Sequence, residues 1–267
     1  AAATESQLAT ARDFAFELTH GTLAVGLGPL AAVTADAVTV QYTNLTTTVG
    51  AGTRLSVAGV TYTFGTTIAA DTVAVSLEGF SAEVAGFVSL AGDLAFRRTG
   101  GDLVAVGAAV TAALEASDSV YARLENADFG LLAGATTFAF ELTDGTLAVA
   151  LGPLANLSVT TATVRYTNAA TSVTAGTSLS AGALRYTFAE AIGADTLAFL
   201  LEGFSADIAD FVALAGDLAL AREGDDLVAV GRGVDASLEA SDSVYVRLAD
   251  ADFGLRGGPD GFGFEMG

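Results

Sequence analysis

Histidine, the side chain that most often carries protons near neutral pH, occurs once in this sequence, as His20. Histidine-based general-base catalysis, a Ser-His-Asp arrangement or imidazole coordination of a metal would each have to use it. His20 directly precedes Gly21, and in a closely similar stretch Asp144 precedes Gly145. Both residue types suit a turn before glycine. We therefore interpret His20 as a turn residue and expect that the chain is not an enzyme.

Carboxylates offer a second kind of chemistry. Asp225 and Asp226 lie in an expected turn, and Asp250 and Asp252 alternate, so they share one face of a strand. Such groups could bind calcium, which takes about six to eight oxygen ligands, or hydrolyse a glycosidic bond if two lie about 5 to 10 Å apart. The alternative is a solvated acidic surface, which charge runs usually form. These four residues are the candidates for a metal site, calcium is the only cofactor considered, and otherwise we expect no cofactor.

Composition limits the partners. The net charge is −20, with 31 acidic residues against 11 basic ones, so the chain should repel phosphate backbones, and we expect no nucleic-acid binding. Cysteine is absent, which rules out disulfides and thiolate metal sites. Two stretches free of charge, residues 145–164 and 166–184, are broken by polar residues and Gly. A spanning helix needs about 20 predominantly apolar residues, so we expect no transmembrane segment.

One unit of sequence occurs twice. Phe14-Ala-Phe-Glu-Leu-Thr-His-Gly-Thr-Leu-Ala-Val25 corresponds to Phe138-Ala-Phe-Glu-Leu-Thr-Asp-Gly-Thr-Leu-Ala-Val149, an offset of 138 − 14 = 124 positions. The offset persists along the whole copy without insertion or deletion. The repeat defines four segments: 1–13 as the end of a preceding repeat, 14–137 as unit 1, 138–261 as unit 2 and 262–267 as the first strand of a partial third repeat. An array of this kind is typical of repeat architectures.

The repeat also tests the candidate sites. Thr160 replaces Asp36, and Gly101 corresponds to Asp225, which argues against an ion site in every copy. The six tyrosines form three equivalent pairs, at positions 42/166, 62/186 and 121/245. They could stack on sugars, but aromatics in sheets usually pack across strands.

The local patterns predict strands. Aromatic and β-branched residues alternate in Phe138–Leu142 and Thr163–Tyr166. The Asp144-Gly145 pair between two such runs predicts a hairpin, as do residues 98–102 and 223–226. A short helix is the alternative for Ser81–Leu90 and its counterpart Ser205–Leu214, where apolar residues fit a helical face weakly. We expect an all-β, elongated tandem-repeat array of mainly antiparallel strands, a β-roll or sandwich-like stack, with a parallel β-solenoid as the alternative.

Two patterns resemble the repeats of very large bacterial surface proteins and adhesins. They are Val88-Ser-Leu-Ala-Gly-Asp-Leu-Ala-Phe-Arg-Arg98, followed by Asp102–Val106, and Phe-Ala-Phe-Glu-Leu followed by a Gly turn and Leu-Ala-Val. The resemblance implies secretion to the cell surface, a stalk or fibre, and calcium as a ligand. It carries no catalytic residue onto this chain.

Three functions follow as hypotheses. The first is a structural subunit of an extracellular fibre, sheath or adhesin stalk that associates with itself, with Phe262, Phe264 and Met266 completing a neighbour by strand addition. On that hypothesis, deleting residues 261–267 should abolish polymerisation. The second is a module that binds calcium, a glycan or another cell-surface ligand. The third is a solenoid-type polysaccharide-degrading enzyme, against which the equal lengths of the two copies count.

Overall fold

The computed structural model describes residues 13–28, 30–241, 244–259 and 261–267. In these residues the secondary structure is entirely strands and turns, which confirms the all-β class. The strands are β1 (Ala15–Gly26), β2 (Ala31–Thr43), β3 (Arg54–Val57), β4 (Val60–Thr63), β5 (Thr72–Val84), β6 (Val88–Thr99), β7 (Asp102–Ser117), β8 (Val120–Ala133), β9 (Phe138–Leu151), β10 (Ala155–Thr167), β11 (Ser178–Ala181), β12 (Leu184–Thr187), β13 (Thr196–Ile208), β14 (Val212–Glu223), β15 (Asp226–Ser241), β16 (Val244–Gly258) and β17 (Gly261–Met266).

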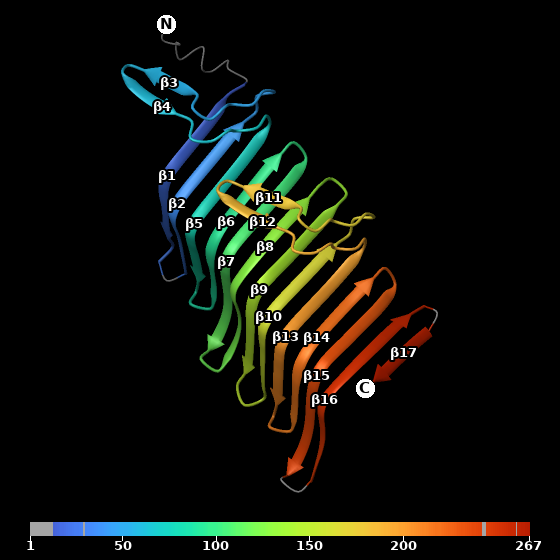
Figure 1. The fold of residues 1–267 in the computed structure, drawn as a ribbon. Coiled ribbons are helices and arrows are strands. Elements are labelled where there is room, and N and C mark those ends of the chain that lie inside the picture. The colour runs from blue at the N-terminus through green and yellow to red at the C-terminus, as the bar shows by residue number, and fades with distance from the viewer. Residues whose placement is uncertain (1–12, 29, 242–243, 260) are drawn as a thin grey trace.

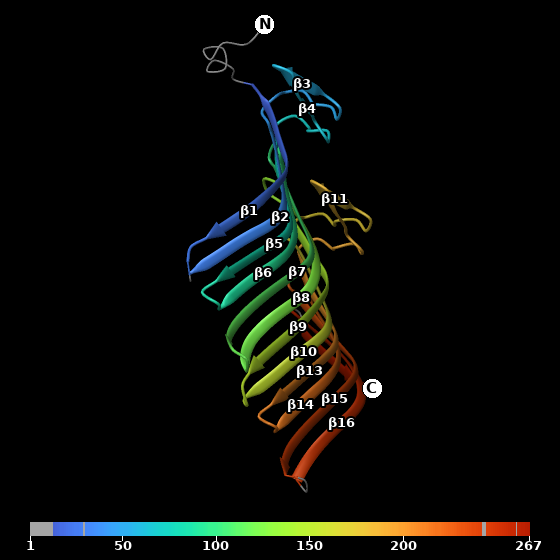
Figure 2. The ribbon, with the colours of Figure 1, turned by 90° about the vertical axis from the view of Figure 1, so that its left-hand side faces the viewer.

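A single 13-stranded sheet runs the length of the molecule, in the order β1-β2-β5-β6-β7-β8-β9-β10-β13-β14-β15-β16-β17. Each strand follows its sequence neighbour, apart from two short hairpins, β3–β4 and β11–β12, which leave the sheet and lie on one side of it (Figures 1 and 2). All the ladders between these strands are antiparallel, so the parallel β-solenoid alternative is wrong. The molecule is an elongated, twisted ribbon.

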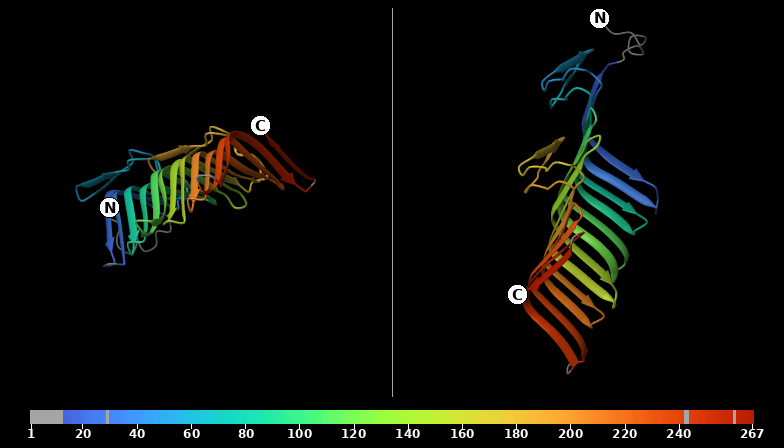
Figure 3. Two further views of the ribbon diagram at one scale, coloured as in Figure 1. Left: turned by 90° about the horizontal axis from the view of Figure 1, so that it is seen from below. Right: turned by 90° about the vertical axis from the view of Figure 1, so that its right-hand side faces the viewer.

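The second layer consists of the two hairpins alone (Figure 3). The largest cluster of buried apolar side chains lies between β11–β12 and the sheet, and includes Val106, Phe188 and Ile192. Elsewhere many large apolar side chains are exposed on the sheet. The described residues therefore form two buried clusters, a larger one where a hairpin covers the sheet and a smaller one around Val159, Ala162 and Phe204 on β10 and β13.

The expected hairpin at Asp144-Gly145 is wrong. β9 continues through these residues, and the register with β10 shifts between Val159 and Ala162. Asp144 has φ +62°, and its counterpart His20 has φ +58°. A positive φ serves a β-bulge as well as a hairpin turn, and here it bends one long strand. The other two predicted hairpins, between β6 and β7 and between β14 and β15, are confirmed.

The short helix considered for Ser81–Leu90 and Ser205–Leu214 is also wrong. The first stretch contains the end of β5, a tight turn and the start of β6, with Val84 paired to Val88. Ala85 and Gly86 have φ +53° and +63° in that turn, and such left-handed residues end a right-handed helix. The apolar residues that suggested a helical face are the ends of two paired strands.

The two units have the same elements in the same order. β9 to β16 of the second unit repeat β1 to β8 of the first, and β8 pairs with β9 along Val120–Ala133, so the sheet crosses the boundary without a break. Among the described residues, no helix is long and apolar enough to span a bilayer.

Candidate functional site: the hairpin seat

Hairpin β11–β12 of the second unit lies across strands of the first unit. It contacts β5, β6, β7 and β8, which Figure 1 shows passing beneath it. We call the sheet surface under it the first seat, made of Ala95, Val104, Val106, Gly130, Leu132 and Ala139. Leu179, Ala181 and Tyr186 of the hairpin are buried against it, with exposures of 5%, 1% and 7%. The contact joins residues on either side of the boundary between the units, for example Tyr186 and Gly130, so the second unit is packed against the first.

Gly130 makes room for the key aromatic of the hairpin. A Cβ atom built at Gly130 would overlap the ring of Tyr186. The Tyr186 ring also makes an edge contact with Phe188, with ring centroids 5.7 Å apart. Glycine is required here for close approach, since any side chain at position 130 would displace the tyrosine.

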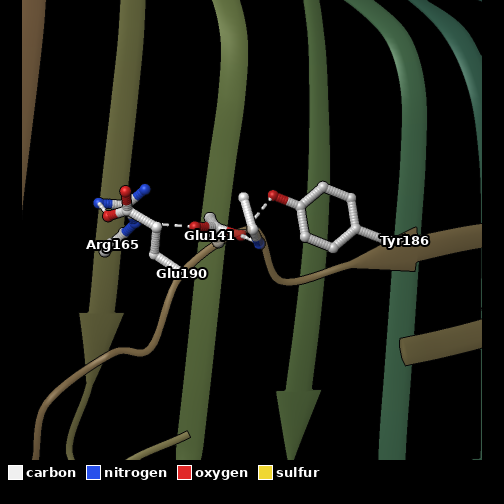
Figure 4. A network of polar contacts seen from close by, with 5 residues as sticks. Glu141, Arg165, Tyr186 and Glu190 are labelled. Carbon is white, nitrogen blue, oxygen red and sulfur yellow. Dashed lines mark hydrogen bonds and ion pairs between the residues drawn. The ribbon is translucent and has the colours of Figure 1, made fainter. Parts of the chain in front are cut away.

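The hydroxyl group of Tyr186 is hydrogen-bonded to a buried carboxylate. It donates a 2.8 Å hydrogen bond to Oε2 of Glu141, a residue of β9 with no exposed surface. Oε1 of Glu141 accepts from Nε of Arg165 at 2.7 Å, and Arg165 also pairs with Glu190 at 2.9 Å (Figure 4). The backbone N–H of Ala189 completes the set at 3.1 Å. A buried charge is tolerated only when it is paired and hydrogen-bonded, so this network fixes the hairpin loop to β9 and β10.

The first unit has the equivalent network, with the neutral Gln41 in the place of Arg165. Glu17 of β1 accepts from Tyr62, from Gln41 and from the backbone N–H of Gly65, each at 2.8 Å. Burial raises the pKa of Glu17, but the hydrogen bonds from Gly65, Gln41, Tyr62 and Thr66 outweigh it, so the pKa lies below its usual value. Burial, then the bond to Glu17, raises the pKa of Tyr62 above 10. Phe64 and Ile68 are buried at the base of the loop, so hairpin β3–β4 is held in place without any sheet beneath its tip.

This first hairpin covers no strand among the described residues. It extends past β1, at the opposite side from β2 (Figures 1 and 3). Leu55, Val57 and Val60 are exposed by 52%, 74% and 76%, whereas their counterparts in the second unit face the first seat. The hairpin therefore presents an apolar surface that has a partner in one unit and none in the other.

A matching surface at the other end of the sheet is covered by none of the described residues. We call it the second seat; its residues occupy the positions 124 further along than those of the first seat, and are Ala219, Val228, Val230, Gly254, Arg256 and Gly263. Val230 is 45% exposed, whereas its counterpart Val106 is 1% exposed. A Cβ atom built at Gly254 would meet no atom within 4 Å. The slot that Tyr186 fills over Gly130 is thus open over Gly254.

The four candidate metal ligands do not come together. Asp226 pairs with Arg256 at 2.6 Å near the start of β15. Asp252 lies at the level of Val234, about seven residues, or roughly 20 Å, along the strands from Asp226. No group of three or more His, Asp or Glu side chains suited to a metal ion occurs in the part of the chain that the structure describes.

Several of the aspartates accept hydrogen bonds from backbone N–H groups, a role that the sequence analysis did not predict. Oδ1 of Asp252 accepts the backbone N–H of Gly233 at 2.9 Å. Three other aspartates do the same at 2.8 Å beside irregularities in the ladders, in the pairs Asp93 with Gly79, Asp128 with Ala109, and Asp217 with Gly203. A bulge leaves an N–H without a ladder partner, and these carboxylates satisfy it. The signal in the sequence is an aspartate recurring near the middle of long strands.

The remaining candidates occupy separate places. Phe262, Phe264 and Met266 lie on β17, which pairs with β16 of its own chain and leaves them more than half exposed. Tyr42 packs on Phe14, which directly precedes β1, and Tyr166 packs on Phe138 of β9. Tyrosines 121 and 245 lie beneath arginine guanidinium groups.

His20 lines a hollow of about 420 Å³ on the hairpin side of the sheet. The hollow lies between the base of the first hairpin and the tip of the second, and its polar lining includes Glu17, Glu78 and Arg97. The hydroxyl of Ser76, which is buried there, makes no hydrogen bond within the described residues. A small polar molecule would fit such a lining.

Comparisons with protein-family models, with curated proteins and with solved structures found no match.

Proposed function

We propose that this protein is a structural repeat protein of an extracellular fibre, sheath or adhesin stalk, which extends by adding copies of its unit edge to edge. One observation carries the proposal. At the boundary between the units, β8 pairs with β9 along its full length, and the hairpin of the second unit packs on the first. The boundary inside the chain is thus a template for boundaries between chains.

Both ends of the described sheet offer an edge for further pairing. β1 is one edge strand, and β17, with Phe262, Phe264 and Met266, is the other. β17 pairs only with the stretch of β16 from Phe253 to Gly258, so the rest of β16 is also an edge. Exposed edges with apolar side chains recruit further strands. The net charge of −20 supports solubility in a long assembly, and the absence of cysteine means that assembly depends on no disulfide.

The test is whether the chain assembles as a strip. Sedimentation velocity over a range of protein concentrations, with negative-stain microscopy of the same samples, should show rods of one width whose length grows with concentration. A monomer at every concentration would contradict the proposal.

The hollow beside His20 supports a second candidate, a module that binds a glycan or calcium at the cell surface. Its polar groups, and the hydroxyl of Ser76 in particular, suit a sugar. A glycan screen and calorimetry with calcium test it, with Arg97→Ala as the site variant and Arg98→Ala as the control. Glycan binding lost in the first variant and kept in the second supports this candidate; equal glycan binding by both rejects the hollow as the site.

A further inference from the structure

We propose that hairpin β3–β4 is a docking element that binds the second seat of another copy of this chain, with β1 of the incoming copy taking the place of β17. The inference rests on the proposed assembly and adds the interface that joins the copies. Its basis is the contact inside the chain, where the equivalent hairpin occupies the equivalent seat.

The two free surfaces match in chemistry. The hairpin offers Leu55, Val57, Val60 and Tyr62 where the seated hairpin has Leu179, Ala181, Leu184 and Tyr186. The second seat keeps Ala219, Val228 and Val230 in the places of Ala95, Val104 and Val106. Burying exposed apolar side chains of this size removes their surface from water, which stabilises an interface.

Tyr62 and Gly254 form the most specific part of the match. The ring of Tyr62 contacts Phe64 edge-on with centroids 5.6 Å apart, as that of Tyr186 contacts Phe188. Its hydroxyl is held by Glu17 just as Glu141 holds Tyr186. The ring is therefore preset in the orientation that fills the slot over Gly130 in the other unit, and Gly254 provides the same slot empty.

The edge strands agree with this arrangement. In the template, Leu124 pairs with Leu147 and Phe129 with Leu142. The equivalent register between copies places Leu248 opposite Leu23, and Phe253 opposite Leu18. β1 would also bring Ala15 and Glu17 into the positions of Gly263 and Glu265, which restores the alanine of the first seat. The one departure is Arg256 in place of Leu132, a leucine that packs against the buried cluster of the first seat; the guanidinium group of Arg256 is paired with Asp226.

The register is tested by cross-linking, because the chain has no native cysteine. Mixing the Leu23→Cys and Leu248→Cys variants under mild oxidation should give a disulfide-linked dimer, while Leu23→Cys with Leu220→Cys, on a strand away from the edge, should give none. Equal yields from the two mixtures would overturn the proposed register.

The contact between hairpin β3–β4 and the second seat is tested by measuring how far variants of either surface assemble. The double variant Val57→Asn and Val60→Asn should reduce the extent of assembly at least tenfold, and so should Gly254→Val, whose side chain fills the slot. All three positions are exposed or open, so the monomer should still fold. Val84→Asn, which is also an exposed valine, is the matched control and should assemble like the parent chain.

Deleting residues 261–267 separates the two ways of adding a strand. If β1 replaces β17, the shortened chain should assemble as well as the parent or better. If β17 itself completes the neighbour, the deletion abolishes assembly, and that result would overturn the inference while leaving the proposed function intact. A parent chain that never assembles contradicts the proposed function instead.

Discussion

At the scale of single residues, two glycines and two glutamates decide how a hairpin is held. Gly130 and Gly254 occupy equivalent positions, one beneath a tyrosine ring and the other open. Glu141 and Glu17 bind the equivalent tyrosines, one with an arginine as its second partner and the other with a glutamine. The same substitution can therefore be made at both positions of a pair, where one position has the contact and the other serves as its control.

Gly130→Ala should destabilise the monomer, because the added methyl group overlaps the ring of Tyr186 in a packed contact. Overpacking of this kind typically costs about 1 to 3 kcal/mol. Gly254→Ala should leave the free energy of unfolding within about 0.5 kcal/mol of the parent value, as is usual at open positions. Urea denaturation measures both. Equal effects of the two substitutions would show that the tyrosine slot is absent in solution.

Acid should loosen the first hairpin through Glu17. Its pKa is lower in the folded protein than the usual value of 4.5, so the hydrogen bonds to the carboxylate contribute stability at neutral pH. That contribution is present above the usual pKa and is lost as the pH falls through the lowered value. The protection factors of the backbone amides of residues 62–68, which compare exchange with that of an unstructured chain at the same pH, should therefore fall below about pH 4.5 in the parent chain. In Glu17→Gln these protection factors should already be lower at neutral pH and change little with acid; parent protection factors that do not change with pH would count against this role.

At the scale of elements, the sequence predicts that strands form, but it does not predict the residues at which they begin and end. Alternating aromatic and β-branched residues predict the strand at Phe138, and glycine-rich turns predict the β6–β7 and β14–β15 hairpins. Asp144-Gly145 misleads, because a positive φ marks a bulge and a hairpin equally well. The chain forms a bulge and not a hairpin turn where the strand segments on both sides continue beside a long neighbouring strand. The presence of such a neighbour is a property of the whole sheet.

The seat could not be predicted for a related reason. Its residues are small or ordinary aliphatic side chains of separate strands, and Gly130 has no turn-like context in the sequence. Only the crossing of a hairpin from the next unit gives them a shared role. The tyrosine pair at 62 and 186 was expected to pack across strands, whereas both side chains fix a hairpin loop by binding a glutamate.

The aspartates beside the bulges should stabilise the strands they bend. Asp93→Ala removes the acceptor of the Gly79 N–H and should cost about 0.5 to 1.5 kcal/mol, the usual net value of such a hydrogen bond. Asp13→Ala, an exposed position before β1, should cost nothing measurable. Denaturation midpoints compare them, and a neutral Asp93→Ala would show that water replaces the carboxylate at this N–H.

At the scale of the whole molecule, charge should oppose the assembly that the edges favour. Copies with a net charge of −20 repel one another, and salt shortens the reach of that repulsion to about 8 Å at physiological ionic strength. Raising sodium chloride from about 10 mM to 150 mM should therefore increase the average rod length measured by sedimentation. Shorter rods at higher salt would mean that ion pairs, and not apolar docking, join the copies.

We expect a hairpin of this protein to be stabilised by the neighbouring unit on which it sits. Hydrogen exchange of the monomeric chain measures this directly, because the two hairpins differ chiefly in whether a seat lies beneath them. Strong protection is expected for the backbone amides of β11–β12, and much weaker protection for those of β3–β4. Equal protection of the two hairpins would contradict it.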